Sequence, residues 1–333
     1  MMSETPLLAV HDLEKRFPLG GGSLSKPRAW VRAVDGVSFS VKRGESFGLV
    51  GESGCGKTTL GQLIVRLIDP TGGRIEFEGQ DYASMNRAEI RLVRKRMQII
   101  FQDPYSSLDP RMKVDSIITE PLRAVQLISK TKRRDAAAEL LERVGLRAVD
   151  LDKYPHEFSG GQRQRIGIAR ALCVRPELVV ADEPVSALDV SIQAQIINLM
   201  LDLKDDFDLS YIFISHDLSV VEHVCDRIAV MYLGTILELA SSESFSIAPR
   251  HPYSRALLMA VPQPDPQRRV KPVSMEEDVP NPVDPPSGCT FHPRCQFAFD
   301  HCRVERPPLV ETIPSHYVAC WLNQGRGIEG EIK

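Results

Sequence analysis

Short apolar runs recur along the chain, and each one ends in glycine or in polar residues. Runs of this length indicate buried strands, because an amphipathic helix needs a longer segment with apolar residues three or four positions apart. Helical patterns separate the runs, which favours an α/β fold in which the strands share one sheet. The predicted strands are Ser46–Val50, Met97–Phe101, Leu178–Ala181 and Tyr211–Ile214.

The N-terminal segment predicts further strands. Residues 7–17 read as an edge strand that enters a loop, and the glycine run that begins at Gly20, together with Pro27, interrupts the structure. From about residue 31 to residue 41, apolar and polar residues alternate, which predicts a second strand. A third, short strand is expected over residues 74–79.

Between Leu108 and about Lys153 the pattern is helical, and no strand-like run interrupts it. We therefore expect a helical insertion, about residues 106–160, between two halves of one sheet. A basic run just upstream predicts another helix, and such a run is usually a solvated face. Its members are Arg87, Arg91, Arg94, Lys95 and Arg96.

The strongest chemical signal is the segment 51–59, which fits the phosphate-binding pattern G-x-x-x-x-G-K-[ST] between a predicted strand and a predicted helix. Its glycines let backbone N–H groups turn toward an anion, and the helix N-terminus adds about half a positive charge. Lys57 would bridge the β- and γ-phosphates, and Thr58 would bind Mg²⁺. The predicted binding residues for a nucleoside triphosphate are Gly51, Glu52, Ser53, Gly54, Cys55, Gly56, Lys57, Thr58 and Thr59.

Polar residues follow the other predicted strands. Gln102, the pair Asp182 and Glu183, and His216 each stand at the end of one. Because α/β sheets bind ligands at the carboxyl ends of their strands, these side chains are expected to converge on one edge. Asp182 is predicted to hold Mg²⁺ through water, and Glu183 to orient or deprotonate the attacking water. A lone histidine such as His216 is more often structural.

A second glycine-led helix start lies at Ser159–Gln162. Ser159 can cap this helix, and Gly160 and Gly161 leave its first N–H groups unobstructed. Two glycines at a helix start lower helical stability, which indicates close backbone approach to another group. An ordinary capped helix is the alternative. The segment predicts a second anion site on the same chain.

A nucleotide base also needs a stacking partner. Phe17 is the first candidate and Trp30 the second, and packing on a hydrophobic face explains either residue equally well.

Composition sets the class of protein. The 333 residues are 43% hydrophobic and 26% charged, with a formal net charge of −3, which suits a globular protein of one large domain or two. This balance offers no argument for a nucleic-acid partner. No apolar run approaches the ~18 residues of a membrane span, and residues 1–8 do not form a secretory signal. We expect a cytoplasmic protein whose seven cysteines are reduced thiols or metal ligands.

From Val261 onward, prolines mark an extended linker that leads to Cys289-x₅-Cys295-x₆-Cys302-x₁₇-Cys320. Four thiolates suit a 4Fe–4S cluster or a tetrahedral Zn²⁺ ion, and unmetallated thiols are the third alternative. The spacing fits no common zinc finger, whose ligands come in closer pairs. His292, His301 and His316 are spare ligand candidates.

Six motifs in this order resemble the ATP-binding subunits of ABC transporters across residues 1–260. They are the phosphate loop, the Gln102 loop, the signature segment Ser159–Gln162, the acid pair Asp182–Glu183, the Asp189 loop and the His216 switch. A finer resemblance, to the dipeptide and oligopeptide permease branch, is carried by residues 101–111, His251-Pro252-Tyr253-Ser254 and the cysteine-bearing tail.

The resemblance implies a RecA-like mixed sheet flanked by helices, an antiparallel β edge, the helical subdomain and a cysteine-rich extension over 261–333. It also implies that Gln102 contacts Mg²⁺ or water, and that Asp189 and the signature segment contact nucleotide held by a second ATPase subunit. That subunit is either a second copy or, as is usual in this branch, a related chain. Tails of this branch are associated with an iron–sulfur cluster. The implied function is ATP hydrolysis that drives import of di- or oligopeptides.

Further implied partners are two transmembrane permease subunits and an extracytoplasmic substrate-binding protein, with the chain peripheral on the cytoplasmic face of the inner membrane. The same type of motor serves other small solutes such as metal chelates, which is the alternative cargo. A non-transport ABC ATPase is a further alternative, disfavoured because the chain carries one cassette and no heptad run.

Overall fold

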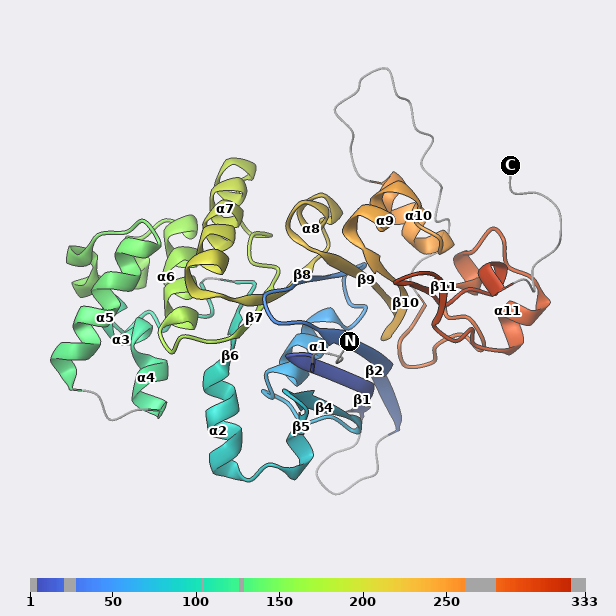
Figure 1. Ribbon diagram of the computed structural model, residues 1–333, viewed down its shortest axis with the longest axis horizontal. Coiled ribbons are helices and arrows are strands. Elements are labelled where there is room, and N and C mark those ends of the chain that lie inside the picture. Colours follow the sequence, from blue (N-terminus) through green and yellow to red (C-terminus); the bar gives the residue numbers. More distant parts are fainter. Residues whose placement is uncertain (1–4, 21–27, 104, 126–128, 261–279, 325–333) are drawn as a thin grey trace, which may run out of the picture.

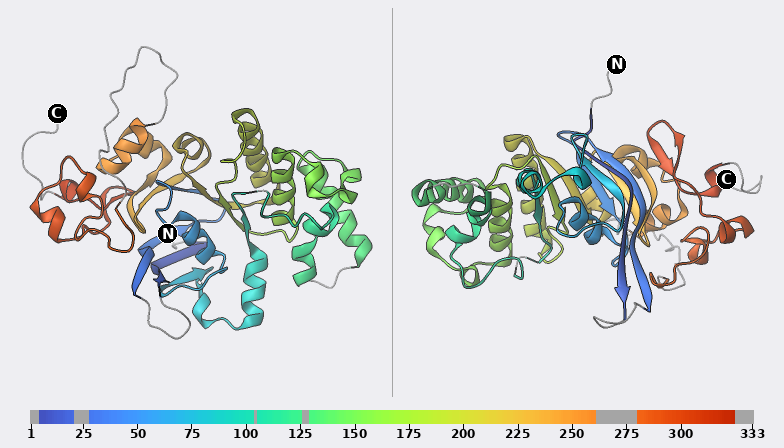
Figure 2. Two further views of the ribbon diagram at one scale, coloured as in Figure 1. Left: turned by 180° about the vertical axis from the view of Figure 1, so that it is seen from behind. Right: turned by 90° about the horizontal axis from the view of Figure 1, so that it is seen from below.

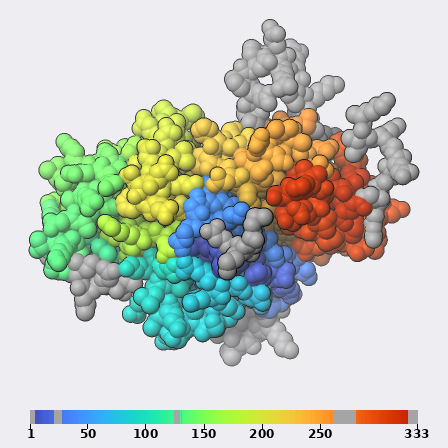
Figure 3. Space-filling model, in the orientation of Figure 1, coloured from blue at the N-terminus to red at the C-terminus, as the bar shows by residue number. Residues whose placement is uncertain are grey.

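The computed structural model describes residues 5–20, 28–103, 105–125, 129–260 and 280–324. Residues 261–279 of the predicted linker and residues 21–27 of the predicted loop lie outside this part of the chain. Figure 1 shows a central sheet, with a group of helices at one end and the C-terminal segment at the other. The space-filling view shows the same order along the long axis (Figure 3).

The central sheet has eight strands in the order β11-β12-β10-β9-β3-β8-β7-β6. Strands β9, β3, β8, β7 and β6 are parallel, and β10, β12 and β11 continue the sheet in antiparallel pairing. All four predicted central strands are present. The bounds are β3 (Ser46–Val50), β6 (Met97–Ile100), β7 (Leu178–Asp182), β8 (Ser210–Ser215), β9 (Arg227–Tyr232), β10 (Thr235–Ser241), β11 (Val310–Ile313) and β12 (His316–Val318).

The parallel strands are mostly apolar because a hydrophobic core covers each face of the sheet. On β7, Val179 belongs to one core and Val180 to the other, and on β8 the same holds for Phe213 and Ile214. The core around Val179 contains residues of α6 (Gly160–Leu172), α7 (Val190–Phe207) and α8 (Leu218–Val224). The opposite core contains residues of α1 (Lys57–Ile64) and of a smaller sheet.

The smaller sheet is antiparallel, in the order β2-β1-β4-β5. Its strands are β1 (Leu8–Leu19), β2 (Ala29–Val41), β4 (Gly72–Phe77) and β5 (Gln80–Asp81). The prediction that β1 is an edge strand is wrong, because β4 pairs with its first half, from Leu8 to Glu14. Beyond Glu14, β1 pairs only with β2, and the two strands project together from the molecule (Figure 2).

The segment between β6 and β7 contains no strand in its described residues, as the helical pattern predicted. It contains α3 (Val114–Ile118), α4 (Glu120–Val125), α5 (Lys130–Arg143), the 3₁₀ turns Ala148–Asp152 and Pro155–Glu157, and α6. Elsewhere the chain forms the 3₁₀ turn Tyr82–Ser84, α2 (Arg87–Arg96), α9 (Ser242–Ile247) and α10 (Pro252–Met259).

We call residues 280–324 the C-terminal extension. It contains the 3₁₀ turns His292–Arg294 and Trp321–Gln324, helix α11 (Asp300–Val304) and strands β11 and β12. Instead of standing apart from the core, it adds β12 to the edge of the central sheet beside β10. No local pattern in the sequence indicated this pairing.

A buried hydrogen bond between His316 and Glu238 fastens β12 to β10. Nε2 of His316 lies 2.6 Å from Oε1 of Glu238, and their side chains are 1% and 0% exposed. Burial opposes ionisation of Glu238, but hydrogen bonds from His316 and from the backbone N–H groups of Arg250 and His251 outweigh it, so the pKa of Glu238 lies below its ordinary value. The pair therefore stabilises the fold above the ordinary carboxyl pKa, and this contribution is lost as the pH falls.

We predict that His316→Ala lowers the free energy of unfolding by about 3 kcal/mol, because it leaves a buried carboxylate without one of its hydrogen-bond donors. Urea titration measures the loss. The control is His11→Ala, since His11 is partly exposed and lies 3.6 Å from Glu76; this change should cost less than about 1 kcal/mol. Equal losses for the two variants would contradict the prediction.

Candidate functional site

A cavity of about 450 Å³ opens where the parallel strands β3, β6, β7 and β8 end. Three kinds of residue line it: the phosphate loop, polar residues that follow the strands, and apolar residues from β2 and the C-terminal extension. They are Val31, Ala33, Ser53, Gly54, Gly56, Lys57, Thr58, Thr59, Gln102, Glu183, His216 and Pro282.

The phosphate loop joins β3 to α1 through left-handed backbone. Gly54 has φ +80° and Gly56, the N-cap of α1, has φ +107°, values that favour glycine. A Cβ atom on Gly56 would lie 2.0 Å from the carbonyl oxygen of Ala33, whereas one on Gly54 would meet nothing within 4 Å. Gly56 therefore lets the loop close against β2.

The ammonium group of Lys57 lies back across this loop. Nζ donates hydrogen bonds to the carbonyl oxygens of Gly51 at 2.8 Å and Glu52 at 2.9 Å, and the residue is only 4% exposed. No carboxylate pairs with this ammonium group among the contacts of the described residues. The positive charge is therefore free to attract phosphate oxygens from within the loop.

Thr58 and Asp182 meet at the floor of the site. The Thr58 hydroxyl donates a 3.0 Å hydrogen bond to Oδ1 of Asp182. Burial raises the pKa of Asp182, the bond from Thr58 opposes this, and the neighbouring charge of Glu183 adds to it. Hydroxyl and carboxylate oxygens at this spacing suit a hard cation such as Mg²⁺.

The three strand-end side chains do meet, as predicted. Gln102 Nε2 donates a 2.7 Å hydrogen bond to Oε2 of Glu183, and Nδ1 of His216 lies 3.2 Å from Oε1. Glu183 has φ +46°, an unfavourable value for a residue with a side chain, which indicates that its neighbours fix its orientation. Its carboxylate is thus held between β6 and β8, facing the phosphate loop.

The signature segment lies outside this cavity. Ser159 and Gln162 cap α6 reciprocally: the Ser159 N–H donates to Oε1 of Gln162 at 3.0 Å, and the Gln162 N–H donates to Oγ of Ser159 at 3.4 Å. A Cβ atom on Gly161 would lie 2.6 Å from Cγ2 of Ile192 in α7. Part of the close approach indicated by the paired glycines is therefore contact within the chain.

Asp189 also lies outside the cavity and caps α7, where Oδ1 accepts a 3.0 Å hydrogen bond from the Ile192 N–H. Phe17 does not line the cavity, and its 37% exposure leaves one face open to solvent. It is directly opposite Val31 in the β1–β2 register, so the two side chains share a face, and Val31 does line the cavity. Trp30, one residue before Val31, faces the other way.

Sequence reasoning missed the contribution of the C-terminal extension. Pro282 forms part of the cavity wall, and Arg294 binds Glu52 of the phosphate loop, 242 residues away in sequence. Tyr253, noted only as part of a motif, accepts a 3.0 Å hydrogen bond from the Glu52 N–H. No spacing rule connects residues this far apart.

The four cysteines of the extension line one small cavity with about 10 Å³ of free space. Burial raises the pKa of Cys289 to about 12 and that of Cys295 to about 11. Across the described ranges, no group of three or more His, Cys, Asp or Glu side chains is arranged to hold a metal ion.

Comparison with known proteins accounts for both the cassette and the extension. Residues 34–186 match the family model described as ABC transporter, and residues 237–302 match the one described as oligopeptide/dipeptide transporter, C-terminal region. Among solved structures, the dimeric post-hydrolysis state of the ATP-binding cassette MJ0796 bound to ADP and Pi superposes with a TM-score of 0.63, at 26% identity, covering 71% of this chain and 98% of that one.

Full-length relatives are more similar. The probable peptide ABC transporter ATP-binding protein y4tS of Sinorhizobium fredii is 52% identical over 94% of this chain and 89% of its own length. The oligopeptide transport ATP-binding protein AppF of Bacillus subtilis is 50% identical over 96% of this chain and 98% of its own. The dipeptide transport ATP-binding protein DppF of Haemophilus influenzae is 48% identical, over 95% and 97%.

The fold and the strand-end site define an ATPase of the ABC class, which uses ATP with Mg²⁺. Within that class, the chain belongs to the ABC transporter ATP-binding subunits that carry the oligopeptide/dipeptide transporter C-terminal region. Within the described ranges, every helix is too short or too polar to cross a bilayer.

We predict that Gly56→Ala weakens ATP binding by about a hundredfold, because the added Cβ forces the loop away from β2. Gly54→Ala is the matched control, since it also places a side chain at positive φ but meets no neighbour. Titration of each purified variant with a fluorescent ATP analogue gives the two dissociation constants. Similar constants would contradict the role assigned to this contact.

Proposed function

We propose that this chain is the ATP-hydrolysing, energy-coupling subunit of an importer of di- or oligopeptides. The observation that carries the proposal is the Glu183 carboxylate, held by Gln102 and His216 at the mouth of an intact phosphate loop. The names of the relatives, together with the matched C-terminal region, support peptides as the cargo.

In the proposed reaction, Lys57 exchanges its two carbonyl partners for the β- and γ-phosphates of ATP. The oxygens of Thr58 and Asp182 would hold a Mg²⁺ ion that neutralises charge on the phosphates, and Gln102 would contact this ion or the water. Glu183 orients the attacking water and accepts its proton, while His216 holds the γ-phosphate in line.

The signature segment supports a second ATPase subunit as a partner. Ser159, Gly160 and Gly161 lie outside the cavity of their own chain, so the Ser159 hydroxyl, the N–H groups of Gly160 and Gly161 and the Asp189 loop are available to nucleotide held by another chain. The cassette MJ0796 was solved as a dimer, which is consistent with this arrangement. A donor supplied in trans is worth roughly 10³–10⁵ in rate in other phosphoryl-transfer systems, so the isolated chain should turn over slowly.

A groove of about 740 Å³ supports docking of the permease subunits. It lies between α2 and the helical segment, and Arg87, Arg91 and Arg94 of the predicted basic face line it together with Pro121 and Val174. The basic run is thus the wall of a groove as well as a solvated face. We propose two permease subunits and a substrate-binding protein as further partners, with this chain peripheral on the cytoplasmic face of the membrane.

The donor set of the extension supports a 4Fe–4S cluster in preference to its two alternatives, a zinc ion and free thiols. Cys289, Cys295, Cys302 and Cys320 line one cavity to which no carboxylate contributes. A cluster binds each sulfur through a different iron, so it does not need the sulfurs gathered around one ion. The free space of about 10 Å³ is smaller than a cluster, and the loops between the cysteines would have to spread to admit one.

We predict that Glu183→Gln lowers ATP turnover of the assembled transporter by about 10²–10⁴-fold, because the water loses its proton acceptor, while ATP still binds. Phosphate release and nucleotide binding are measured separately. Since bound ATP then persists, ATP should also hold this variant and its partner ATPase together during size-exclusion chromatography.

The control for that change is Glu243→Gln, which alters an exposed glutamate in the first turn of α9. Turnover should stay at the wild-type rate. If Glu183→Gln hydrolyses ATP as fast as Glu243→Gln does, the proposed base is wrong.

For the cysteines, we predict that the anaerobically purified chain contains about four irons and four sulfides. Replacing Cys302 by Ser should remove both, whereas replacing Cys173, a buried cysteine of the core, should remove neither. Iron and acid-labile sulfide assays decide the matter. Stoichiometric zinc without iron, or no metal, would refute the cluster.

A further inference from the structure

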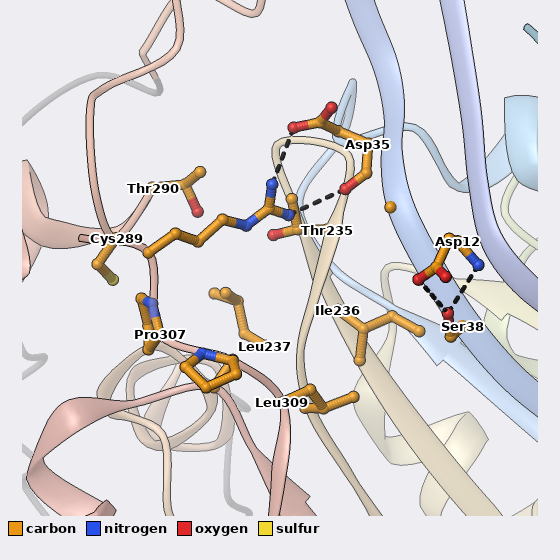
Figure 4. A pocket seen from close by; sticks show the side chains of 14 residues that line it. Asp12, Asp35, Ser38, Thr235, Ile236, Leu237, Cys289, Thr290, Pro307 and Leu309 are labelled. Carbon is orange, nitrogen blue, oxygen red and sulfur yellow. Dashed lines mark hydrogen bonds and ion pairs between the residues drawn. The ribbon is translucent and has the colours of Figure 1, made fainter. Parts of the chain in front are cut away.

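The C-terminal extension touches both walls of the nucleotide cavity. On the β2 side, the carbonyl oxygen of Pro282 accepts a 3.3 Å hydrogen bond from the Arg32 N–H. Further along, Arg306 donates hydrogen bonds to Oδ2 and to the carbonyl oxygen of Asp35 in β2, both at 2.9 Å. These two residues line a second cavity, which lies between the extension and β2 (Figure 4). On the phosphate-loop side, the contact is made by Arg294.

Arg294 binds Glu52, the second residue of the phosphate loop, with both ends of its guanidinium group. Nη1 lies 2.8 Å from Oε2 and Nη2 lies 3.2 Å from Oε1. The two side chains are 6% and 20% exposed. A bidentate, charge-assisted pair that is largely shielded from water is among the stronger polar contacts in proteins, and it fixes direction as well as distance.

The backbone of Glu52 is held at the same time. Its N–H donates to the Tyr253 hydroxyl at 3.0 Å, and its carbonyl accepts from Lys57 at 2.9 Å. The Tyr253 ring packs against Phe291 of the extension, with ring centroids 5.2 Å apart. The attachments of Glu52 to Tyr253 and to Arg294 therefore come from outside the loop, and the extension makes or supports both.

The negative charge of Glu52 means that its pairing with Arg294 affects the binding of ATP. A carboxylate within a loop that receives phosphates repels them, and the repulsion is strong where water is scarce. Arg294 neutralises that carboxylate and turns it away from the cavity, which Glu52 does not line. Loop N–H groups that are oriented before the ligand arrives also avoid the entropy cost of ordering them.

We propose that Arg294 is a positioning residue of the ATP site: it neutralises Glu52 and holds the phosphate loop open toward the nucleotide. The C-terminal extension is therefore part of the nucleotide site of its own chain. This inference rests on the proposed function, because it concerns the affinity of the same site for ATP.

The test measures the dissociation constant of a fluorescent ATP analogue for the purified full-length chain, at low and at high salt. Arg294→Met should weaken binding about tenfold, because it removes a charge-assisted contact and exposes the phosphates to an unpaired carboxylate. The deficit should shrink at high salt, which screens that repulsion. The double variant Arg294→Met/Glu52→Gln should bind ATP more tightly than Arg294→Met, since the carboxylate is gone.

Arg306→Met is the matched control. It removes another arginine by which the extension contacts the core, but one that does not touch the phosphate loop, so the dissociation constant should stay at the wild-type value. Equal weakening by Arg306→Met and Arg294→Met would mean general loosening of the extension and would overturn the proposal. So would an unchanged affinity in Arg294→Met, or a double variant no better than Arg294→Met.

If Arg294→Met does not fold, Arg294→Lys provides the test, because it keeps the positive charge but cannot make the two-point contact with Glu52. This variant should bind ATP more weakly than the wild type, and wild-type affinity would overturn the proposal. Failure of the wild-type chain itself to bind ATP would instead refute the proposed function.

Discussion

Parallel pairing is the constraint on which this site depends. Strands β3, β6, β7 and β8 all run in one direction, so the residues that follow them emerge at one edge of the sheet. Gly51, Gln102, Glu183 and His216 each stand one or two residues beyond such a strand end. The direction of the strands alone therefore brings residues from four distant segments together around one cavity.

The same constraint explains how much could be predicted from the sequence. A strand buried on both faces is apolar at most of its positions, so the predicted runs at 46–50, 178–181 and 211–214 stand out without knowledge of the fold. The end of each strand then sets the position of the residue that follows it. The contact of Glu183 with Gln102 and His216 follows from this logic and from no other sequence signal.

Contacts between residues that are far apart in the sequence could not be predicted in this way. The pairing of β12 with β10, the place of Pro282 in the cavity wall and the Arg294–Glu52 contact all join segments that share no periodicity. The edge-strand prediction for β1 failed for a related reason, because alternation reveals which face is buried but not how many neighbours a strand has. The glycines at 160 and 161 were recognised as unusual, yet sequence alone gave no indication that Ile192 is one of the groups they approach.

The residues predicted to contact nucleotide lie in two separate places on this chain. The phosphate loop and the Glu183 cluster face one cavity, while the signature segment, on a helix capped by its own Ser159 and Gln162, faces elsewhere. Contact between Gly161 and Ile192 packs α6 closely against α7, so the signature segment is carried on a packed pair of helices rather than on a loose loop. Such a pair can move as a unit.

The place of β12 in the sheet has a consequence for biosynthesis. Glu238 and its partner His316 are 78 residues apart, so a ribosome working at roughly 5–20 residues per second exposes the edge of β10 for on the order of 4–16 seconds before β12 is made. Unpaired backbone groups on such an edge are a template for wrong association with other nascent chains. Safe production of this ATPase therefore depends on what shields β10 during that interval.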